Sequence, residues 1–571
     1  MRRVLPLMLA MVAGTATPFE SRNANAGVNF VGSNTCALCH RTIYDEFRKT
    51  SMGRSFGEAS PHLKMLLPES TEVRSSTPGH AYQVFWEEGR LYQSESFIDE
   101  NGARAHGTRF SADYIIGSGA SGYTFLFRRG NRLFEAPLSY YSRTRSWDLS
   151  PGFDAYDAGF TRPVRIACLE CHIGRLAAVG KADTDFATNA FTEQAIGCEN
   201  CHGPGELHVR ERGATIRATS PDDSIVNPAR LSRPLANDIC IRCHQGNDAR
   251  VFRSGKTLDD FRPGTPLSNI LYIFKVSLRR DRKAQQSDLL EHGFAMMLSK
   301  CYLRSTSMTC TTCHSVHRNV EPAEKAAYYR SKCLTCHSVA SCGLDISQRG
   351  PDDCISCHMP KRAVATVAHT ALTNHRIVRG PDAAYPDAAY FETPNTPGLI
   401  NVTATTGADK QRVPEIALLE AYRALLTQAP WLQERYLLLL DHLKVQAPDN
   451  PIVLAAAGHE LVASNSSVGA KQAIPLLQKA LQAAQFDSDV YLDLADALSK
   501  QRRIDEAVNV LKQGLARDPY EPKVYKALIA LALKAEKYAD AISAGRDYLR
   551  LYPADQKVRT LLNELHNMTA N

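Results

Sequence analysis

The strongest constraint on the fold of this chain is a five-residue motif, C-x-x-C-H, that occurs seven times. It accounts for fourteen of the sixteen cysteines in 571 residues. Chance would give about 0.01 copies in a chain of this composition. The seven copies are Cys36-Cys39-His40, Cys168-Cys171-His172, Cys198-Cys201-His202, Cys240-Cys243-His244, Cys310-Cys313-His314, Cys333-Cys336-His337 and Cys354-Cys357-His358.

The spacing within the motif predicts covalently attached haem. Two thiols three positions apart can add to the two vinyl groups of one haem, and the adjacent histidine then ligates the iron from below the porphyrin plane. Structural zinc sites pair C-x-x-C units without a histidine in this position, and disulfides do not require one. We therefore predict seven covalent c-type haems, attached through the fourteen motif cysteines, with the seven motif histidines as metal ligands.

Seven haems leave little protein for a conventional core. The predicted haem domain, residues 27–400, offers about 53 residues for each haem. The haems must then form much of the core, with little regular secondary structure around them. After Cys168 the motifs follow one another at short intervals, which suits electron hopping between neighbouring haems.

The N-terminus predicts export. Arg2 and Arg3 precede an apolar run from Val4 to Ala13, and the small-residue site Ala24-Asn25-Ala26 precedes Gly27. This layout is typical of a signal peptide, residues 1–26, cleaved after Ala26, and indicates a periplasmic or secreted protein. A buried helix is the alternative. No later stretch has 18 apolar residues in a row, so we expect no membrane span.

The formal charge of +7 does not indicate a nucleic-acid partner. Fourteen haem propionates would turn the net charge of the holoprotein slightly negative. Basic clusters could pair with these propionates or form a solvated surface. They are Arg128-Arg129, Arg132, Arg279-Arg280 and Arg282-Lys283.

A second axial ligand on each iron decides between electron transfer and catalysis at an open position. Eight histidines of the haem domain lie outside the motifs: His62, His80, His106, His208, His292, His317, His369 and His375. His317 follows its motif by three residues and suits a neighbouring haem rather than its own. His208 lies in "CHGPGELH" and has a similar position. Met52, in "KTSMGRS", is a candidate for the first iron, with ordinary packing as the alternative.

Two cysteines lie outside the motifs. Cys301 and Cys342 could form a disulfide in an oxidising compartment or stay as thiols. No motif carries lysine in place of its histidine, the replacement that marks the catalytic haem of one class of nitrite reductase.

Aromatic and β-branched runs predict a β-rich insertion at about residues 80–150. The runs "YQVFWEEGRLYQSESF" and "GYTFLFRRGNRLFEAPLSYY" are each broken by a turn-like glycine, the pattern of a β-hairpin.

The C-terminal region predicts helical repeats. Residues 380–412 have a linker composition rich in Pro, Asn and Thr. Beyond them, pairs such as Tyr491 and Tyr525, or Ala507 and Ala541, are 34 residues apart, which is the period of tetratricopeptide repeats. We assign residues 401–571 to the linker and three to four such repeats, which form an α-solenoid suited to protein docking. A plain helical bundle is the alternative.

Several segments resemble exported multihaem c-type cytochromes that carry C-terminal tetratricopeptide repeats. The segments are "VGSNTCALCHRTIYDEFRKTSMGRSF", "GCENCHGPGELH", "MTCTTCHSVH" and "DCISCHMPKR" with "HTALTNHRI". The wider superfamily contains the tetrahaem cytochrome of ammonia oxidisers, hydroxylamine oxidoreductase and pentahaem nitrite reductase. The resemblance implies distal ligation by His208, His317 and either His369 or His375, with His375 preferred; His292 is a weaker candidate.

The sequence therefore predicts a mainly α protein. A heptahaem cytochrome c domain with a β-rich insertion precedes an α-solenoid of tetratricopeptide repeats. The predicted function is electron transfer between redox protein partners. The alternatives are an oxidoreductase that acts on a small nitrogen or sulfur compound at one open haem, and a scaffold in which the repeats dominate. The catalytic haem lysine and the catalytic tyrosine cross-link of the superfamily's enzymes are not identified in this sequence.

Overall fold

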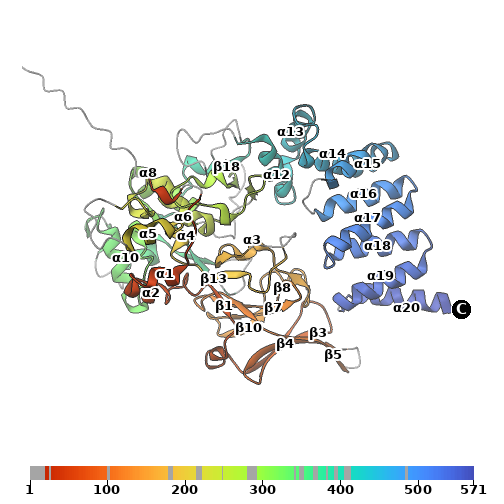
Figure 1. The fold of residues 1–571 in the computed structure, drawn as a ribbon, viewed down its shortest axis with the longest axis horizontal. Coiled ribbons are helices and arrows are strands. Elements are labelled where there is room, and N and C mark those ends of the chain that lie inside the picture. The colour runs from red at the N-terminus through yellow and green to blue at the C-terminus, as the bar shows by residue number, and fades with distance from the viewer. Residues whose placement is uncertain are drawn as a thin grey trace, which may run out of the picture.

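The structure is a computed structural model. It describes residues 20–24, 27–98, 103–177, 184–213, 222–246, 249–278, 292–339, 342–345, 353–363, 369, 371–380, 383–390, 396–403, 413–482, 487–553 and 555–570. The described chain has three regions: segments that carry the motifs, a β-rich region, and a row of helices that ends at the C-terminus (Figure 1).

Short helices carry or adjoin the seven motifs. The helices of this region are α1 (Ser33–Ala37), α2 (Arg41–Phe47), α3 (Ile166–Leu169), α4 (Glu199–His202), α5 (Glu206–Gly213), α6 (Arg233–His244), α7 (His292–Met297), α8 (Lys300–Arg304), α9 (Cys310–Cys313), α10 (Lys325–Cys333) and α11 (Cys354–His358). Short 3₁₀ turns lie between them: η1 (Arg22–Ala24), η3 (Pro228–Arg230), η4 (Leu258–Asp260), η5 (Leu267–Asn269), η6 (Pro322–Glu324) and η9 (Asp387–Tyr390). A helical turn brings residues three apart to one side, so both thiols of a motif share a face.

Small antiparallel sheets connect these segments. Strand β12 (Ile173–Leu176) pairs with β13 (Phe191–Ala195), and β16 (Lys361–Ala363) pairs with β17 (Ala371–Thr373). Strand β15 (Leu271–Val276) lies between β14 (Ala249–Phe252) and β18 (Leu399–Asn401). Residues 399–401, which the sequence assigned to a linker, are therefore part of a sheet.

The β-rich region is larger than expected and covers residues 56–163. One four-stranded antiparallel sheet has the order β2-β3-β4-β5: β2 (Ser70–Arg74), β3 (His80–Glu87), β4 (Arg90–Ile98) and β5 (Arg104–Ser111). A second sheet contains β1 (Phe56–Glu58), β6 (Tyr114–Ile116), β7 (Gly122–Arg129), β8 (Arg132–Glu135), β9 (Leu138–Tyr141), β10 (Ser146–Leu149) and β11 (Arg162–Pro163), and η2 (Pro61–Met65) lies beside the strands.

Both predicted hairpins are present. The β3–β4 hairpin turns at Glu88 and Gly89, both with positive φ, which is the backbone of a tight two-residue turn. The β7–β8 hairpin turns at Gly130. Phe125, Phe127 and Phe134 of these strands are almost fully buried and form the core of the region.

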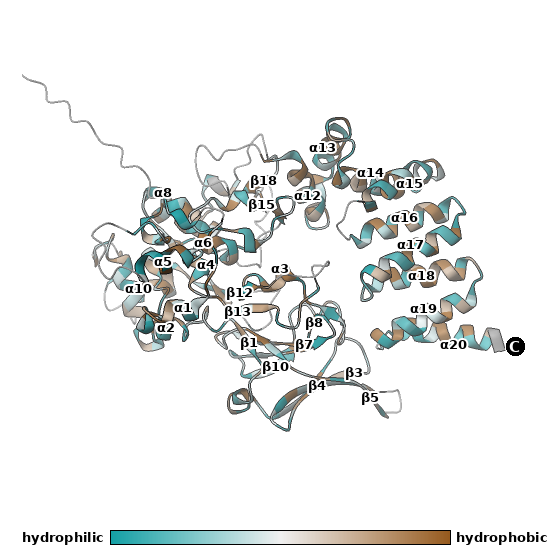
Figure 2. Ribbon diagram, in the orientation of Figure 1, coloured by the Kyte–Doolittle hydropathy of each residue, from teal (hydrophilic) through white to brown (hydrophobic). Residues whose placement is uncertain are grey.

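The helices after residue 413 form the predicted repeats. They are α12 (Glu415–Leu425), α13 (Gln433–Gln446), α14 (Pro451–Ala463), α15 (Ser467–Gln482), α16 (Ser488–Lys500), α17 (Ile504–Arg517), α18 (Pro522–Lys534), α19 (Tyr538–Leu551) and α20 (Gln556–Ala570), with η10 (Pro430–Leu432) before α13. Ala473, Ala507 and Ala541 are fully buried at equivalent places in α15, α17 and α19, where small side chains allow close helix packing. Figure 2 shows apolar and polar positions alternating along these helices, as expected for amphipathic helices that stack.

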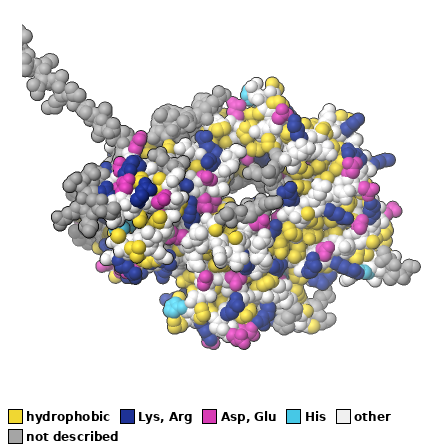
Figure 3. Space-filling model, in the orientation of Figure 1, with side chains coloured by type: hydrophobic (Ala, Val, Ile, Leu, Met, Phe, Trp, Pro, Cys, Tyr) yellow, Lys and Arg dark blue, Asp and Glu magenta, His cyan; other side chains and the backbone are white. Residues whose placement is uncertain are grey.

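The row of helices is anchored to the rest of the protein at two places. Near its start, Leu418 and Tyr422 of α12 belong to one buried cluster with Tyr272 and Phe274 of β15. Farther along, the turn between α17 and α18 contacts the β-rich region. The space-filling view shows an opening between these parts (Figure 3).

Arg132 lies at the second of these contacts and forms ion pairs there. Arg132 lies 2.7 Å from Asp518 and 3.7 Å from Asp185, and the side chains of Arg132 and Asp518 are only 8% and 12% exposed. Tyr520 packs against Phe134 at 4.7 Å between ring centres and lies under the guanidinium of Arg132. Arg132, predicted as a propionate partner, thus has partners within the protein. Residues 279–283 lie outside the described residues.

None of the helices in the described part of the chain has the length and apolar character needed to cross a bilayer.

A buried polar network lies in the β-rich region. The ring of His80 contacts Asp157 at 2.8 Å and Glu95 at 3.2 Å, and its side chain is 1% exposed. Ser75 and Tyr82 also donate hydrogen bonds to Asp157. Burial by itself would lower the pKa of His80, but the hydrogen bonds to Asp157 and Glu95 outweigh it and raise the pKa to about 9. His80 is therefore a structural cation and not a free ligand.

The raised pKa of His80 predicts a pH-dependent stability. Its stabilising contribution is complete below the ordinary value of 6.5 and is lost as the pH rises through about 9. We expect the free energy of unfolding to fall by roughly 3 kcal/mol over this range. Denaturation of a His80→Gln variant should lack this decrease, whereas the exposed control His62→Gln should keep it. Equal pH profiles for the two variants would contradict the assignment.

The Arg132 contact predicts a large mutational effect. Arg132→Ala leaves Asp518 and Asp185 without their buried cation, and we expect a loss of about 3 kcal/mol in urea denaturation. Lys479→Ala removes an exposed ion pair with Asp449 in the same row of helices and should cost about 1 kcal/mol or less. Similar losses in both variants would show that the contact does not stabilise the arrangement.

Candidate haem sites

Four motif histidines each face a second imidazole from a distant segment. The distances between ring centres and the angles between ring planes are 6.3 Å and 19° for His40 and His208, 6.1 Å and 12° for His202 and His317, 6.0 Å and 43° for His244 and His292, and 6.0 Å and 26° for His314 and His375. The four partners come from α5, from the segment after α9, from the start of α7 and from the segment after β17.

This separation fits one metal ion between each pair of rings. Two metal–nitrogen bonds of about 2 Å, together with the distance from each ring centre to its nitrogen, add to about 6 Å. None of the sixteen cysteines, all of which lie within the described residues, is in a disulfide, and this includes Cys301 and Cys342.

Hydrogen bonds orient several of these rings. The Nδ1 atoms of His202 and His375 lie 2.8 Å and 2.9 Å from the carbonyls of Val226 and Thr373, and Nδ1 of His208 lies 2.8 Å from Asp222. A ring whose Nδ1 is held in this way presents Nε2 to a metal, which is the usual arrangement of metal-bound histidine. The motif histidine His358 is held likewise, by Val378 at 2.8 Å.

Burial keeps several of these imidazoles neutral. It lowers the pKa of His292 to about 3 and that of His314 to about 4, and neighbouring histidines lower both further. Partial burial also lowers the pKa of His202 and His375. A neutral imidazole is the form that binds a metal.

The other three motif histidines lack such a partner among the described residues: no histidine ring stacks on His172, His337 or His358 there. His369 does not supply one, because its Nε2 lies 2.6 Å from Asp148. His62 is exposed, and the side chain of His106 lies outside the described part.

Met52 was one candidate for the first iron, with ordinary packing as the alternative. The ring opposite His40 is that of His208. The carbonyl of Met52 accepts hydrogen bonds from Ser55, whose hydroxyl also donates to the carbonyl of His172.

The motifs lie next to one another in an order that differs from the sequence. Thiols of different motifs lie close enough to shift one another's pKa. The pairs are Cys36 with Cys198, Cys171 with Cys243, Cys240 with Cys310, and Cys333 with Cys354. Cys201 is also close enough to Cys240, and Cys313 to Cys336, for their charges to interact. We number the motifs 1 to 7 along the chain. In space, motifs 1, 3, 4, 5, 6 and 7 follow one another in a row, written 1-3-4-5-6-7, and motif 2 lies beside motif 4.

Apolar and basic side chains at the motifs fit a porphyrin with propionates. Leu38, between the two cysteines of the first motif, is 83% exposed, and a haem plane would cover it. Arg212, Arg242 and Arg376 each bury a guanidinium nitrogen that has no hydrogen-bond partner among the described residues. These three arginines lie close in sequence to His208, His244 and His375, and propionate oxygens would satisfy them. Sequence analysis missed them because their burial is not visible in composition.

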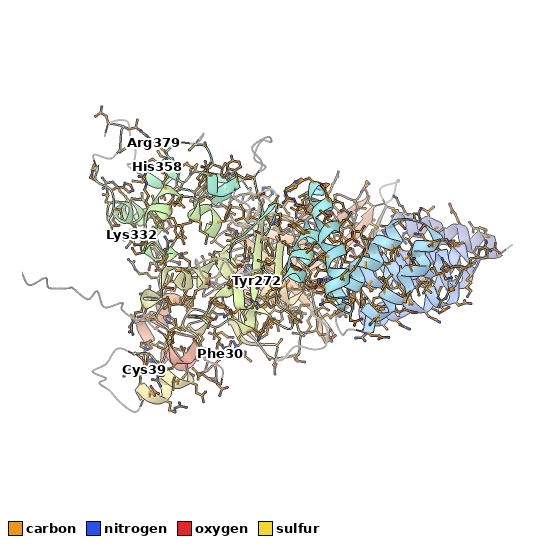
Figure 4. The ribbon with its side chains drawn as sticks, turned by 90° about the horizontal axis from the view of Figure 1, so that it is seen from above. Phe30, Cys39, Tyr272, Lys332, His358 and Arg379 are labelled. Carbon is orange, nitrogen blue, oxygen red and sulfur yellow. The ribbon has the colours of Figure 1, made fainter. Side chains whose placement is uncertain are left out.

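The first and last motifs lie at the end of the molecule away from the repeats. Figure 4 shows Cys39 and His358 there, while the helices from α12 onward extend to the opposite end.

Two segments of the chain match models of known protein families. A family model described as cytochrome c554 and c-prime matches residues 157–203, which include motif 2 and motif 3. A tetratricopeptide repeat model matches residues 470–531. No curated protein matches the chain.

Several solved structures resemble the repeat region. A tetratricopeptide repeat protein of Thermus thermophilus, TTC0263, is 19% identical over 27% of this chain and 84% of its own, with a TM-score of 0.23. YrrB, described as a repeat protein with an unusual peptide-binding site, is 18% identical over 28% of this chain and 78% of its own, with a TM-score of 0.24. MamA MSR-1 is 25% identical over 25% of this chain and 78% of its own, with a TM-score of 0.20. These scores are too low to support an argument about the whole chain. The family models show a C-terminal tetratricopeptide repeat region and a segment similar to cytochrome c554 and c-prime.

The paired rings predict the effect of removing one distal imidazole. His208→Leu should leave the haem of the first motif with one axial ligand and convert one low-spin ferric signal to high-spin in the electron paramagnetic resonance spectrum. His369→Leu, in which the lost imidazole faces Asp148, should leave the spectrum unchanged. An unchanged spectrum in His208→Leu, at equal haem content, would contradict the pairing.

Proposed function

We propose that this protein is an exported electron-transfer cytochrome with seven covalent haems and a repeat domain that docks protein partners. The observation that carries the proposal is the set of four imidazole pairs, each about 6 Å apart and each containing one motif histidine. The family model for cytochrome c554 and c-prime, which covers motif 2 and motif 3, agrees with it.

Two imidazoles per iron favour electron transfer over catalysis. When bound, a haem supplies an iron that cycles between the ferric and ferrous states. At the four motifs with paired rings, the two histidines would hold the iron from both sides and would leave substrate no coordination site. The hydrogen bonds to Nδ1 of His202, His208 and His375 fix ring orientation and so limit rearrangement.

The contacts between motifs support a continuous route for electrons. The row 1-3-4-5-6-7 has thiol contacts or close approaches at every step, so the attached haems would be neighbours throughout. Motif 2 adjoins the row through Cys171 and Cys243. A row with two ends suits transfer between a donor and an acceptor.

The repeat region supplies the docking part of the proposal. Tetratricopeptide helices are protein-interaction modules, and here they are anchored both to β15 and to the β-rich region. A partner bound to this frame would be held at a fixed place relative to the haems.

A second candidate function is reduction or oxidation of a small nitrogen or sulfur compound at one haem. It is favoured by His172, which is half-buried and has no imidazole stacked on it among the described residues. Because motif 2 branches from the row at motif 4, a substrate there could exchange electrons with the other haems.

Ligand addition distinguishes the two functions. Nitrite and hydroxylamine are added separately to the oxidised holoprotein, and its electron paramagnetic resonance and optical spectra are recorded. Electron transfer alone predicts no change on either addition and full reduction by dithionite. Loss of a high-spin signal on addition of either compound would overturn the carrier assignment and support catalysis at an open haem.

A further inference from the structure

The segment Ser21–Asn23 is part of the folded protein, although it lies before the expected cleavage site at Ala26. Asn23 is completely buried, and its side-chain amide donates to the carbonyls of His202 and Pro204, at 2.9 Å each. Its side-chain oxygen accepts a hydrogen bond from Ser21 at 2.7 Å. All polar groups of the Asn23 side chain are thus used within the protein.

Arg22 ties the same segment to two acidic residues. Its guanidinium lies 2.6 Å from Glu211 and 2.8 Å from Asp223, and its backbone N–H donates to the carbonyl of Asp223 at 2.9 Å. Glu211 belongs to α5, the helix that carries His208. Ser21–Asn23 therefore acts as a clip that binds both ends of the stretch from His202 to α5. This stretch contains His202 and His208, two of the paired histidines.

The chain is adapted to this close approach at Gly203. Gly203 has φ of 73°, and a Cβ atom there would lie 3.0 Å from the amide nitrogen of Asn23. A side chain at this position would strain the backbone and crowd the amide.

Cleavage after Ala26 would remove this clip. The carbonyl of Pro204 would lose its donor, and that of His202 would keep only the N–H of Val226 at 3.2 Å. A buried carbonyl without a partner is costly. Such a cut would also leave 13 residues, including charged Glu20 and Arg22, between the apolar run and the cleaved bond. Gly14-Thr15-Ala16 follows the apolar run directly and has small residues at both positions that a signal peptidase selects.

We propose that the export signal ends at Ala16, and that the mature chain begins at Thr17 and keeps Ser21–Asn23 as a clip on the haem-binding stretch. A signal peptidase would hydrolyse the Ala16–Thr17 bond, with water supplying the carboxylate oxygen of Ala16 and the amine proton of Thr17. This inference rests on the export that the proposed function includes.

N-terminal sequencing of the holoprotein from the periplasm of a host with cytochrome c maturation tests the site. We expect Thr17 as the first residue, an unprocessed chain for Ala16→Leu, and normal processing for Ala26→Leu. Gly27 as the first residue, with processing blocked by Ala26→Leu, would overturn the inference and leave export intact. A wild-type chain that still begins at Met1 would instead overturn export itself.

A second comparison tests the clip. Two chains are placed behind one foreign signal peptide, so that they begin at Thr17 or at Gly27. We expect the chain that begins at Gly27 to lose its haem absorbance on heating at a lower temperature. Equal melting midpoints would show that Ser21–Asn23 contributes nothing to the folded protein.

Discussion

The rest of the structure depends on the distance between paired imidazoles. Each of the four pairs joins a motif histidine to a ring from a distant segment, at a separation that one iron spans. An iron bound to both rings is a long-range cross-link, and its binding energy contributes to folding. Such links would add to the buried apolar cluster that Ile239 and Ile241 of α6 form with Phe294 of α7.

The β-rich region and the repeats form a frame beside the motif-bearing segments. The repeats pack on β15 through α12 and on the β-rich region through Asp518 and Tyr520. A frame held at two places can keep the row of motifs and a docked partner in a fixed relation. The proposed transfer of electrons would need this, because its rate depends on distance.

Sequence predicted the features that depend on local spacing, and it missed those that depend on three-dimensional packing. The motifs and the 34-residue period are local patterns, so the sequence alone predicted them. It did not predict the spatial row of motifs, because the approach of Cys171 to Cys243 joins separate segments. His369 and His375 are six residues apart, and only packing directs one to Asp148 and the other to His314. The charge of Arg132 left open a propionate partner or a solvated surface, but its buried partners are Asp185 and Asp518.

The most direct test of the account is the number of haems bound covalently to the purified protein. The holoprotein is denatured, extracted with acidified acetone to remove free haem, and assayed as the pyridine haemochrome against protein concentration. The account predicts seven haems per chain in the extracted protein, one for each C-x-x-C-H motif. Absence of haem absorbance from the extracted protein, with the pigment in the acetone, would contradict it.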